Sequence, residues 1–305
     1  MHDLTAENVD DCVMAAAHFA PEPVAARFER RLRELLACGA ATGLVLDVPL
    51  DQRRSCRAAA AWVFVDEARH QQFHDVRPPQ LDAWIVDEVL EPGAGVLSRD
   101  EVARANAGDG LNMFVLFFRG DDRPLTESDH GRVVHEMMAH VFPQLTGYNL
   151  RSLTARARHH SQAISAVQAG TTLLHPSELP PAPAPAVLPN SVLVHADRDS
   201  VPFASWVAGA FVWRKPVVGF SAAEQRTLSL ALRGYRDARI AEACGVSAST
   251  IKKRWDSIFA RVAAAVPTLF GDAADSPLGR RGPEKRTTLL SYLSRHPEEL
   301  RPYQL

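Results

Sequence analysis

The chain has 305 residues, of which 46 % are apolar and 23 % charged, and its formal net charge is −2. This length suits two domains, and this composition excludes a chain that is disordered throughout. The charge is uneven, because residues 1–218 carry a net −7, residues 219–266 a net +4 and residues 267–305 a net +1. An acidic body with a basic carboxy-terminal segment is expected where one part of a protein meets nucleic acid.

The cysteines and the apolar runs indicate in which cellular compartment the protein is expected. The four cysteines are widely spaced and form no Cys-x-x-Cys pair, which argues against a cysteine zinc site and a disulfide framework: Cys12, Cys38, Cys56 and Cys244. The acidic start lacks the apolar core of a secretion signal, and the longest apolar runs are too short to cross a bilayer. We therefore expect a cytoplasmic protein with reduced thiols and no membrane partner.

The amino-terminal part mixes predicted helices and strands. Apolar spacing predicts helices over residues 21–37, 78–91 and 126–145, the last of them capped by Thr126 or Ser128. Strands are predicted at residues 44–48, 60–68 and 111–119, and a further helix at residues 150–168.

A proline-rich stretch follows. Residues 175–191 hold six prolines, a density typical of an extended, semi-rigid spacer between domains. Residues 192–219 are predicted to be a connecting segment of short strands around a turn at Asp197–Ser200.

The segment 220–266 predicts three helices. Ser221 and Glu224 form a capping box that begins the first helix, and Gly234 ends it. Gly245 makes a tight turn after the second helix, and Ser247 caps the third. Apolar residues recur at helical spacing along the third helix, and we expect Trp255 and Cys244 to be core residues.

This segment resembles the LuxR/GerE-type DNA-binding domain through "FSAAEQRTL", "RIAEACGVSASTIKKRW" and "SIFARV". The resemblance implies an all-α domain with a helix-turn-helix whose second helix enters the major groove of double-stranded DNA. Two departures are Arg226, where an acidic residue is usual, and Asp256, where a basic residue is frequent.

Residues 20–165 resemble a GAF/PAS-like sensor domain, most closely in "VLFFRGDDRPLTESDHGRVVHEMMAHVFPQL". The expected organisation is an α+β GAF/PAS-like domain followed by an all-α LuxR-type domain. The expected boundaries are residues 1–174 for the sensor or interaction domain, 175–191 for the linker, 192–219 for the connecting segment and 220–305 for the DNA-binding domain with an extra helix.

The LuxR/GerE resemblance and helix chemistry together predict the DNA-binding residues. Lys252 and Lys253 are expected in the groove, and Arg254 on a flanking phosphate. Short hydroxyls at a helix amino terminus suit phosphate, and an aspartate can accept from a cytosine amino group. The resemblance implies that Ser249, Thr250 and Arg236 contact the DNA backbone, and the remaining predicted residues are Ser247 and Asp256. With about five phosphates neutralised per subunit, the log–log salt slope should be on the order of −4 to −5.

Aromatic residues of the amino-terminal part are candidates for lining a pocket for an unknown small-molecule effector, with membership of an ordinary core as the alternative. They are Trp62, Phe64, Trp84, Phe114 and Phe117.

Histidine spacings do not predict a metal site. His135 and His140 lie five residues apart, which places them about 140° apart around a regular helix and argues against one shared metal. His70 and His74 lie four residues apart and could bind a metal or haem, but a solvated pair is the more common arrangement. With no nucleophile or acid–base pair in view, we expect no enzyme activity, no metal and no cofactor.

These patterns favour a transcription regulator that binds DNA as a homodimer under the control of its amino-terminal domain. A helix beginning near Pro283 could supply the dimer contact or be a plain surface helix. The alternative is a protein-interaction module that docks RNA polymerase or an anti-regulator, with DNA contact secondary.

Overall fold

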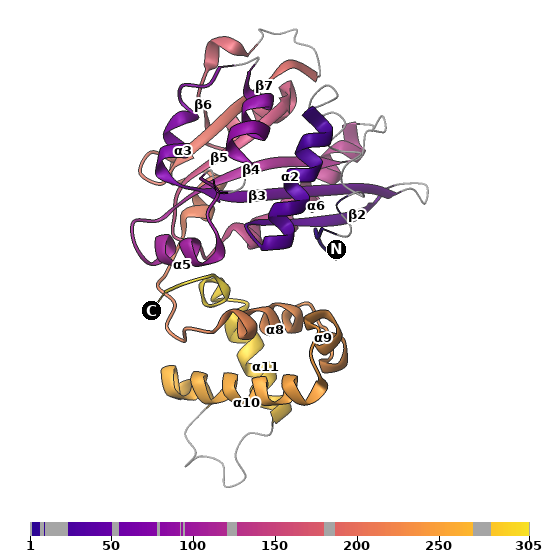
Figure 1. Ribbon diagram of the computed structural model, residues 1–305, viewed down its shortest axis with the longest axis vertical. Helices are drawn as coiled ribbons and strands as arrows, with labels where there is room; N and C mark the ends of the chain where they lie inside the picture. Colours follow the sequence, from indigo (N-terminus) through magenta and orange to yellow (C-terminus); the bar gives the residue numbers. More distant parts are fainter. Residues whose placement is uncertain are drawn as a thin grey trace. The chain divides into compact units, whose positions relative to one another are not determined.

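The computed structural model describes residues 2–6, 9, 24–50, 55–77, 80–91, 93, 95–120, 127–179, 187–270 and 282–304 (Figure 1). The chain forms two compact units. Unit 1 comprises residues 1–145 and 149–212, and unit 2 comprises residues 146–148 and 213–305. Thr126, one of the two predicted helix caps, lies outside the described residues.

Unit 1 is built on one seven-stranded sheet with the order β1-β2-β3-β4-β5-β7-β6. The strands are β1 (His2–Asp3), β2 (Ala41–Pro49), β3 (Ser55–Val65), β4 (Leu111–Gly120), β5 (Leu150–His159), β6 (Thr172–Leu173) and β7 (Val187–Asp197). Only the β4–β5 pair is parallel among these neighbours, and the other pairs are antiparallel. The unit therefore belongs to the expected α+β class.

The helices of unit 1 connect and cover these strands. They are α2 (Val24–Cys38), α3 (Glu67–Gln72), α4 (Leu81–Trp84), the π-helix η2 (Ile85–Val89), α5 (Arg99–Ala107), α6 (Glu127–Leu145), α7 (His160–Gln168) and the 3-10 turns η3 (Pro176–Glu178) and η4 (Trp206–Phe211). The parallel strands β4 and β5 are joined by α6, as parallel pairing requires a long crossover.

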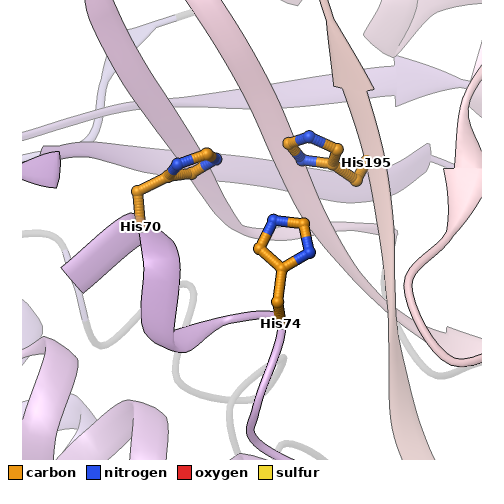
Figure 2. A group of neighbouring side chains, drawn as sticks. All are labelled: His70, His74 and His195. Carbon is orange, nitrogen blue, oxygen red and sulfur yellow. The ribbon is translucent and has the colours of Figure 1, made fainter. Parts of the chain in front are cut away.

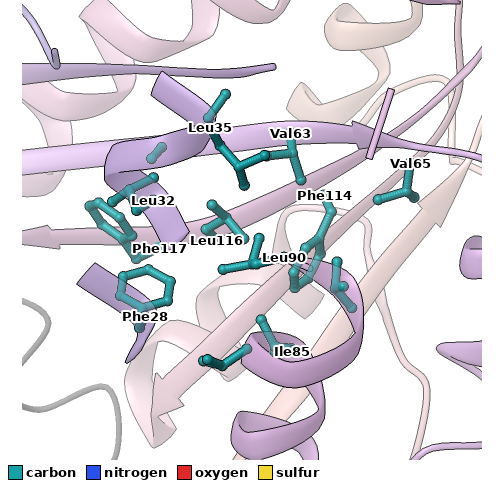
Figure 3. Close-up of a cluster of buried hydrophobic side chains, with 14 of the residues drawn as sticks. Phe28, Leu32, Leu35, Val63, Val65, Ile85, Leu90, Phe114, Leu116 and Phe117 are labelled. Atoms are coloured by element: carbon teal, nitrogen blue, oxygen red, sulfur yellow. The ribbon is translucent and has the colours of Figure 1, made fainter. Parts of the chain in front are cut away.

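The central strands are apolar on both faces. The apolar stripe of α2, with Phe28, Leu32 and Leu35, and the helical turns through Ile85 and Leu90 form one buried cluster with β3 and β4 (Figure 3). Helix α6 packs against β2 and β3. A strand buried on both faces carries a nearly continuous apolar run, which explains why residues 111–117 show no polar alternation.

The predicted helix over residues 150–168 is wrong in its first half. Residues Leu150–His159 form β5, and only His160–Gln168 is helical. The arginines, alanines and leucines of this segment favour a helix locally. Hydrogen bonding to β4 on one side and β7 on the other outweighs that preference.

The predicted spacer over residues 175–191 is also wrong where it is described. Residues from Val187 onward belong to β7, which pairs with β5 in the middle of unit 1. The connecting segment 192–219 divides in the same way, because β7 and η4 belong to unit 1 and the chain enters unit 2 at Trp213. The prolines of residues 180–186 lie outside the described part.

Unit 2 is helical. Its elements are α8 (Ala222–Leu232), α9 (Asp237–Cys244), α10 (Ala248–Ala265), η5 (Pro267–Phe270), α11 (Gly282–Leu293) and η6 (Pro297–Leu300). These elements share one apolar core that includes Phe220, Leu228, Ile240, Ile258 and Leu289.

Within the described ranges, no helix is both long enough and apolar enough to cross a membrane. The described cysteines Cys38, Cys56 and Cys244 are free thiols.

Candidate nucleic-acid interface

The first helix of unit 2 begins at the predicted capping box. Ser221 Oγ accepts from the Glu224 backbone N–H at 3.3 Å, and the Glu224 carboxylate accepts from the Ser221 N–H at 2.8 Å. Glu224 is buried, and it also accepts from Ser257 Oγ at 2.8 Å and pairs with Arg261 at 3.3 Å. One carboxylate thus holds the start of α8 against α10.

The ionisation of Glu224 should be linked to the stability of unit 2. Burial raises the pKa of Glu224. Hydrogen bonds from Ser221 and Ser257 and the charge of Arg261 lower it by more, so the pKa lies below its ordinary value. Because the pKa is lowered, the ionised carboxylate stabilises the fold at pH values above the ordinary pKa of about 4.5. This stabilisation is lost as the pH falls through the folded-state pKa.

We expect Glu224→Gln to lower the free energy of unfolding at neutral pH by about 1.5–3 kcal/mol, because hydrogen bonds to a buried charge are lost. The difference from the unaltered protein should shrink as the pH falls below the ordinary value of about 4.5 and through the lowered pKa of Glu224. Urea unfolding followed by tryptophan fluorescence at several pH values measures both effects. Equal stability at neutral pH would show that this network does not hold α8 to α10.

Arg226 stands where the LuxR/GerE resemblance leads us to expect an acidic residue, and its partner lies on α9. Its guanidinium donates to the Ala243 carbonyl at 2.8 Å, in the last turn of α9. A cation at the carboxy terminus of a helix interacts favourably with the helix dipole. This contact joins α8 to α9.

The turn between α9 and α10 is short and consists of a left-handed glycine followed by a helix cap. Gly245 ends α9 in the left-handed conformation, with φ of 64°, which favours glycine. Ser247 then caps α10, since its Oγ accepts from the Thr250 N–H at 3.1 Å. The hydroxyls of Ser249 and Thr250 lie 2.8 and 2.9 Å from the same oxygen.

Helix α10 has a buried stripe and an outward face. Ile251, Trp255, Ile258 and Val262 are buried. At about 100° per residue, a second set of side chains, which lies outside this stripe, falls within an arc of about 100°. They include Ser249, Lys252, Lys253 and Asp256, all of which are exposed.

The other predicted residues lie elsewhere. Arg254 is half-buried, and its guanidinium donates to Thr227 Oγ1 at 2.9 Å and to the Ala223 carbonyl at 3.3 Å. Arg254 therefore braces α10 against α8, whereas a contact with a flanking phosphate was expected. Arg236 is exposed just before α9.

Trp255 is a core residue, as predicted, and it ties three helices together. Its ring stacks on Phe259 and lies under the Arg286 guanidinium, 4.5 Å from the ring centroid. Its Nε1 donates to Asp237 Oδ1 at 3.2 Å, and Arg286 pairs with the same oxygen at 2.7 Å. Asp237 and Arg286 were not predicted, because neither stands in a motif that would bring them together.

One face of helix α11 belongs to the core of unit 2. Leu289, Tyr292 and Leu293 are buried in the core of unit 2, so these side chains are occupied within their own unit. Tyr292 also donates to the buried Glu299 carboxylate at 2.9 Å, which accepts from the backbone of Val218 as well.

The predicted aromatic pocket in unit 1 is wrong as a single site. Phe114 pairs with Val63 and Phe117 with Ala61, and these residues share the face of the sheet covered by α2. Alternate residues of a strand point to opposite faces, so Trp62 and Phe64, which flank Val63 in β3, point to the other face. Trp84 packs with the α2-side cluster. The five aromatics are thus divided between two layers of ordinary core.

No family model matches the chain, and the searches of characterised proteins and of solved structures find no match either.

Proposed function

We propose that this protein is a sequence-specific DNA-binding transcription regulator of LuxR/GerE type, in which unit 2 binds DNA and unit 1 controls it. The observation that carries the proposal is the outward face of α10. Ser249, Lys252 and Lys253 lie there together, at the amino-terminal end of a helix joined to α9 by a tight glycine turn.

The chemistry of this face suits a duplex. The major groove of B-DNA admits an α-helix, whose amino-terminal turns meet base edges and phosphates. Neither Lys252 nor Lys253 has an ion-pair partner within the described ranges, so no internal contact must be broken for either amine to reach DNA. The backbone N–H groups and the positive end of the helix dipole add to the attraction for phosphate.

The salt dependence of binding tests this proposal. With Arg254 engaged within unit 2, the exposed cations at the interface are Lys252, Lys253 and Arg236. Three phosphate contacts predict a log–log slope of about −3 per subunit, shallower than the −4 to −5 that about five contacts would give. Sites selected from random duplexes, followed by mobility shifts over a salt series, measure it. Absence of any complex at low salt would refute DNA binding.

The control of DNA binding is a further part of the proposal. Unit 1 acts as a GAF/PAS-like domain that responds to a small-molecule effector or a partner protein, and the regulator works as a cytoplasmic homodimer. Since the buried residues of α11 are occupied, a dimer contact must use other surfaces. Sedimentation velocity with and without a selected duplex measures the oligomeric state.

Asp256 favours a second candidate function, a module that docks RNA polymerase or an anti-regulator. Its carboxylate lies on the outward face of α10 and repels phosphate, and the net +4 of residues 219–266 is modest for a DNA-binding segment. Regulation that persists in cells when Lys252 and Lys253 are both neutralised would favour this module over DNA binding.

A further inference from the structure

Three histidines from two distant segments meet on one face of the sheet of unit 1. His70 lies in α3, His74 just after that helix, and His195 in β7. Their ring centroids are 5.5–5.8 Å apart in all three pairs. Figure 2 shows one ring nitrogen of His74 directed between the rings of the other two. One ligand atom from each histidine lies within 4.8 Å of the others.

The hydrogen bonds of His195 define which nitrogen carries its proton. Its Nε2 lies 3.0 Å from Asp197 Oδ2, and a carboxylate only accepts, so Nε2 is the protonated nitrogen. Its Nδ1 then holds the lone pair and accepts from Thr154 Oγ1 at 2.8 Å. A carboxylate behind a histidine is the outer-shell arrangement that orients a metal-ligating imidazole and raises its basicity.

His70 is buried but incompletely hydrogen bonded. Its Nε2 lies 3.0 Å from Ser152 Oγ, whereas its Nδ1 has no partner within the described ranges. A buried polar atom without a partner is an exception that requires an explanation, such as a bound ion or water.

We propose that His70, His74 and His195 bind a divalent transition-metal ion of the zinc type. Neutral imidazoles are preferred ligands of Zn²⁺, and three histidines leave a fourth position for water or a small anion. This set contains no oxygen ligand, which disfavours Mg²⁺ and Ca²⁺. The site lies wholly within unit 1 and does not depend on the proposed DNA binding.

The geometry needs only a small adjustment. Zn–N distances near 2.0 Å in a tetrahedral site place the ligand nitrogens roughly 3.3 Å apart. His70 and His195 are held by buried hydrogen bonds, whereas His74 is exposed and no side-chain hydrogen bond holds it within the described ranges. Rotation of the His74 ring brings its nitrogen closer to the other two, and binding at His195 Nδ1 also requires the Thr154 hydroxyl to turn away from that nitrogen.

Calorimetric titration of the untagged, chelator-treated full chain with ZnCl₂ tests the proposal, with Co²⁺ absorption as a second readout of tetrahedral coordination. We expect one equivalent of metal per chain and no comparable binding of Mg²⁺. His74→Ala and His195→Ala should each weaken Zn²⁺ binding at least about tenfold, because each removes a ligand.

His74→Ala is the decisive variant, since His74 is exposed and its loss should leave the fold intact by circular dichroism. His135→Ala is the matched control, because His135 is an exposed histidine of α6 outside the cluster, and its affinity for Zn²⁺ should equal that of the unaltered chain. The proposal fails if the unaltered chain does not bind Zn²⁺, or if His74→Ala binds it as tightly as the control.

Discussion

Replacing Lys252 and Lys253 together with alanine is expected to weaken specific DNA binding at least about 30-fold per subunit. In the proposed complex each lysine contributes a contact to a base or a phosphate, and each such contact is worth about 1–3 kcal/mol. The log–log salt slope should become shallower by about 2 units per subunit, because two fewer counterions are displaced. Mobility shifts on a selected duplex measure both quantities.

The matched control is the double variant Arg214→Ala and Lys215→Ala. It removes the same charge from exposed positions of unit 2 that lie outside α10. Its affinity should fall far less than that of the α10 variant. Equal losses in the two variants would mean that binding follows the net charge of the unit, and the assignment of α10 as the recognition helix would be wrong.

Replacing Trp255 with alanine is expected to lower the free energy of unfolding of unit 2 by about 3–5 kcal/mol. The side chain is 6 % exposed, and its removal leaves a cavity between α10, α9 and α11. It also removes the hydrogen bond to Asp237 and leaves Arg286 without the ring beneath it. Urea unfolding followed by circular dichroism measures the change.

Two variants bracket this prediction. Trp255→Phe keeps an aromatic ring in the core and should lose less stability than the alanine variant. Val217→Ala alters an exposed apolar residue of the same unit, and its effect should stay within about 0.5 kcal/mol. A loss below about 1 kcal/mol for Trp255→Ala would show that the three helices hold together without this residue.

The two largest predictions separate recognition from stability. The lysines project from the outward face of α10 and have little internal role, so their loss should change DNA affinity at constant stability. Trp255 lies on the buried face of the same helix, and its loss should change stability first. The polar and apolar residues along residues 247–262 lie on different faces of the helix, so the proposed DNA contact and the packing of unit 2 can be altered separately.

The helices of unit 2 were largely predictable from the sequence. The Ser221–Glu224 box, the glycine turn at Gly245 and the Ser247 cap act between residues close in the chain, so their chemistry is readable without the fold. The partners of Glu224 on α10 were not predictable, because Ser257 and Arg261 reach it only once the helices have packed.

The strands of unit 1 were predictable only where their residues are strongly apolar. β2, β3 and β4 were expected near their observed places. The residues of β5 predict a helix and the first residues of β7 predict a spacer. Both predictions are wrong because strand formation there depends on neighbours distant in sequence. The prediction of an aromatic pocket is wrong for a related reason, since the face to which each ring points depends on strand pairing and register.

The histidines show most clearly where local sequence stops being informative. The spacing of His70 and His74 was visible, but their third partner stands more than a hundred residues later, on a strand that was itself partly misassigned. Caps, turns and apolar stripes depend on interactions within a few residues, and the linear chain therefore carries them in full. The histidine triangle, the split of the aromatic residues and the inward bond of Arg254 depend on which distant segments pair and pack, and those contacts exist only in the folded molecule.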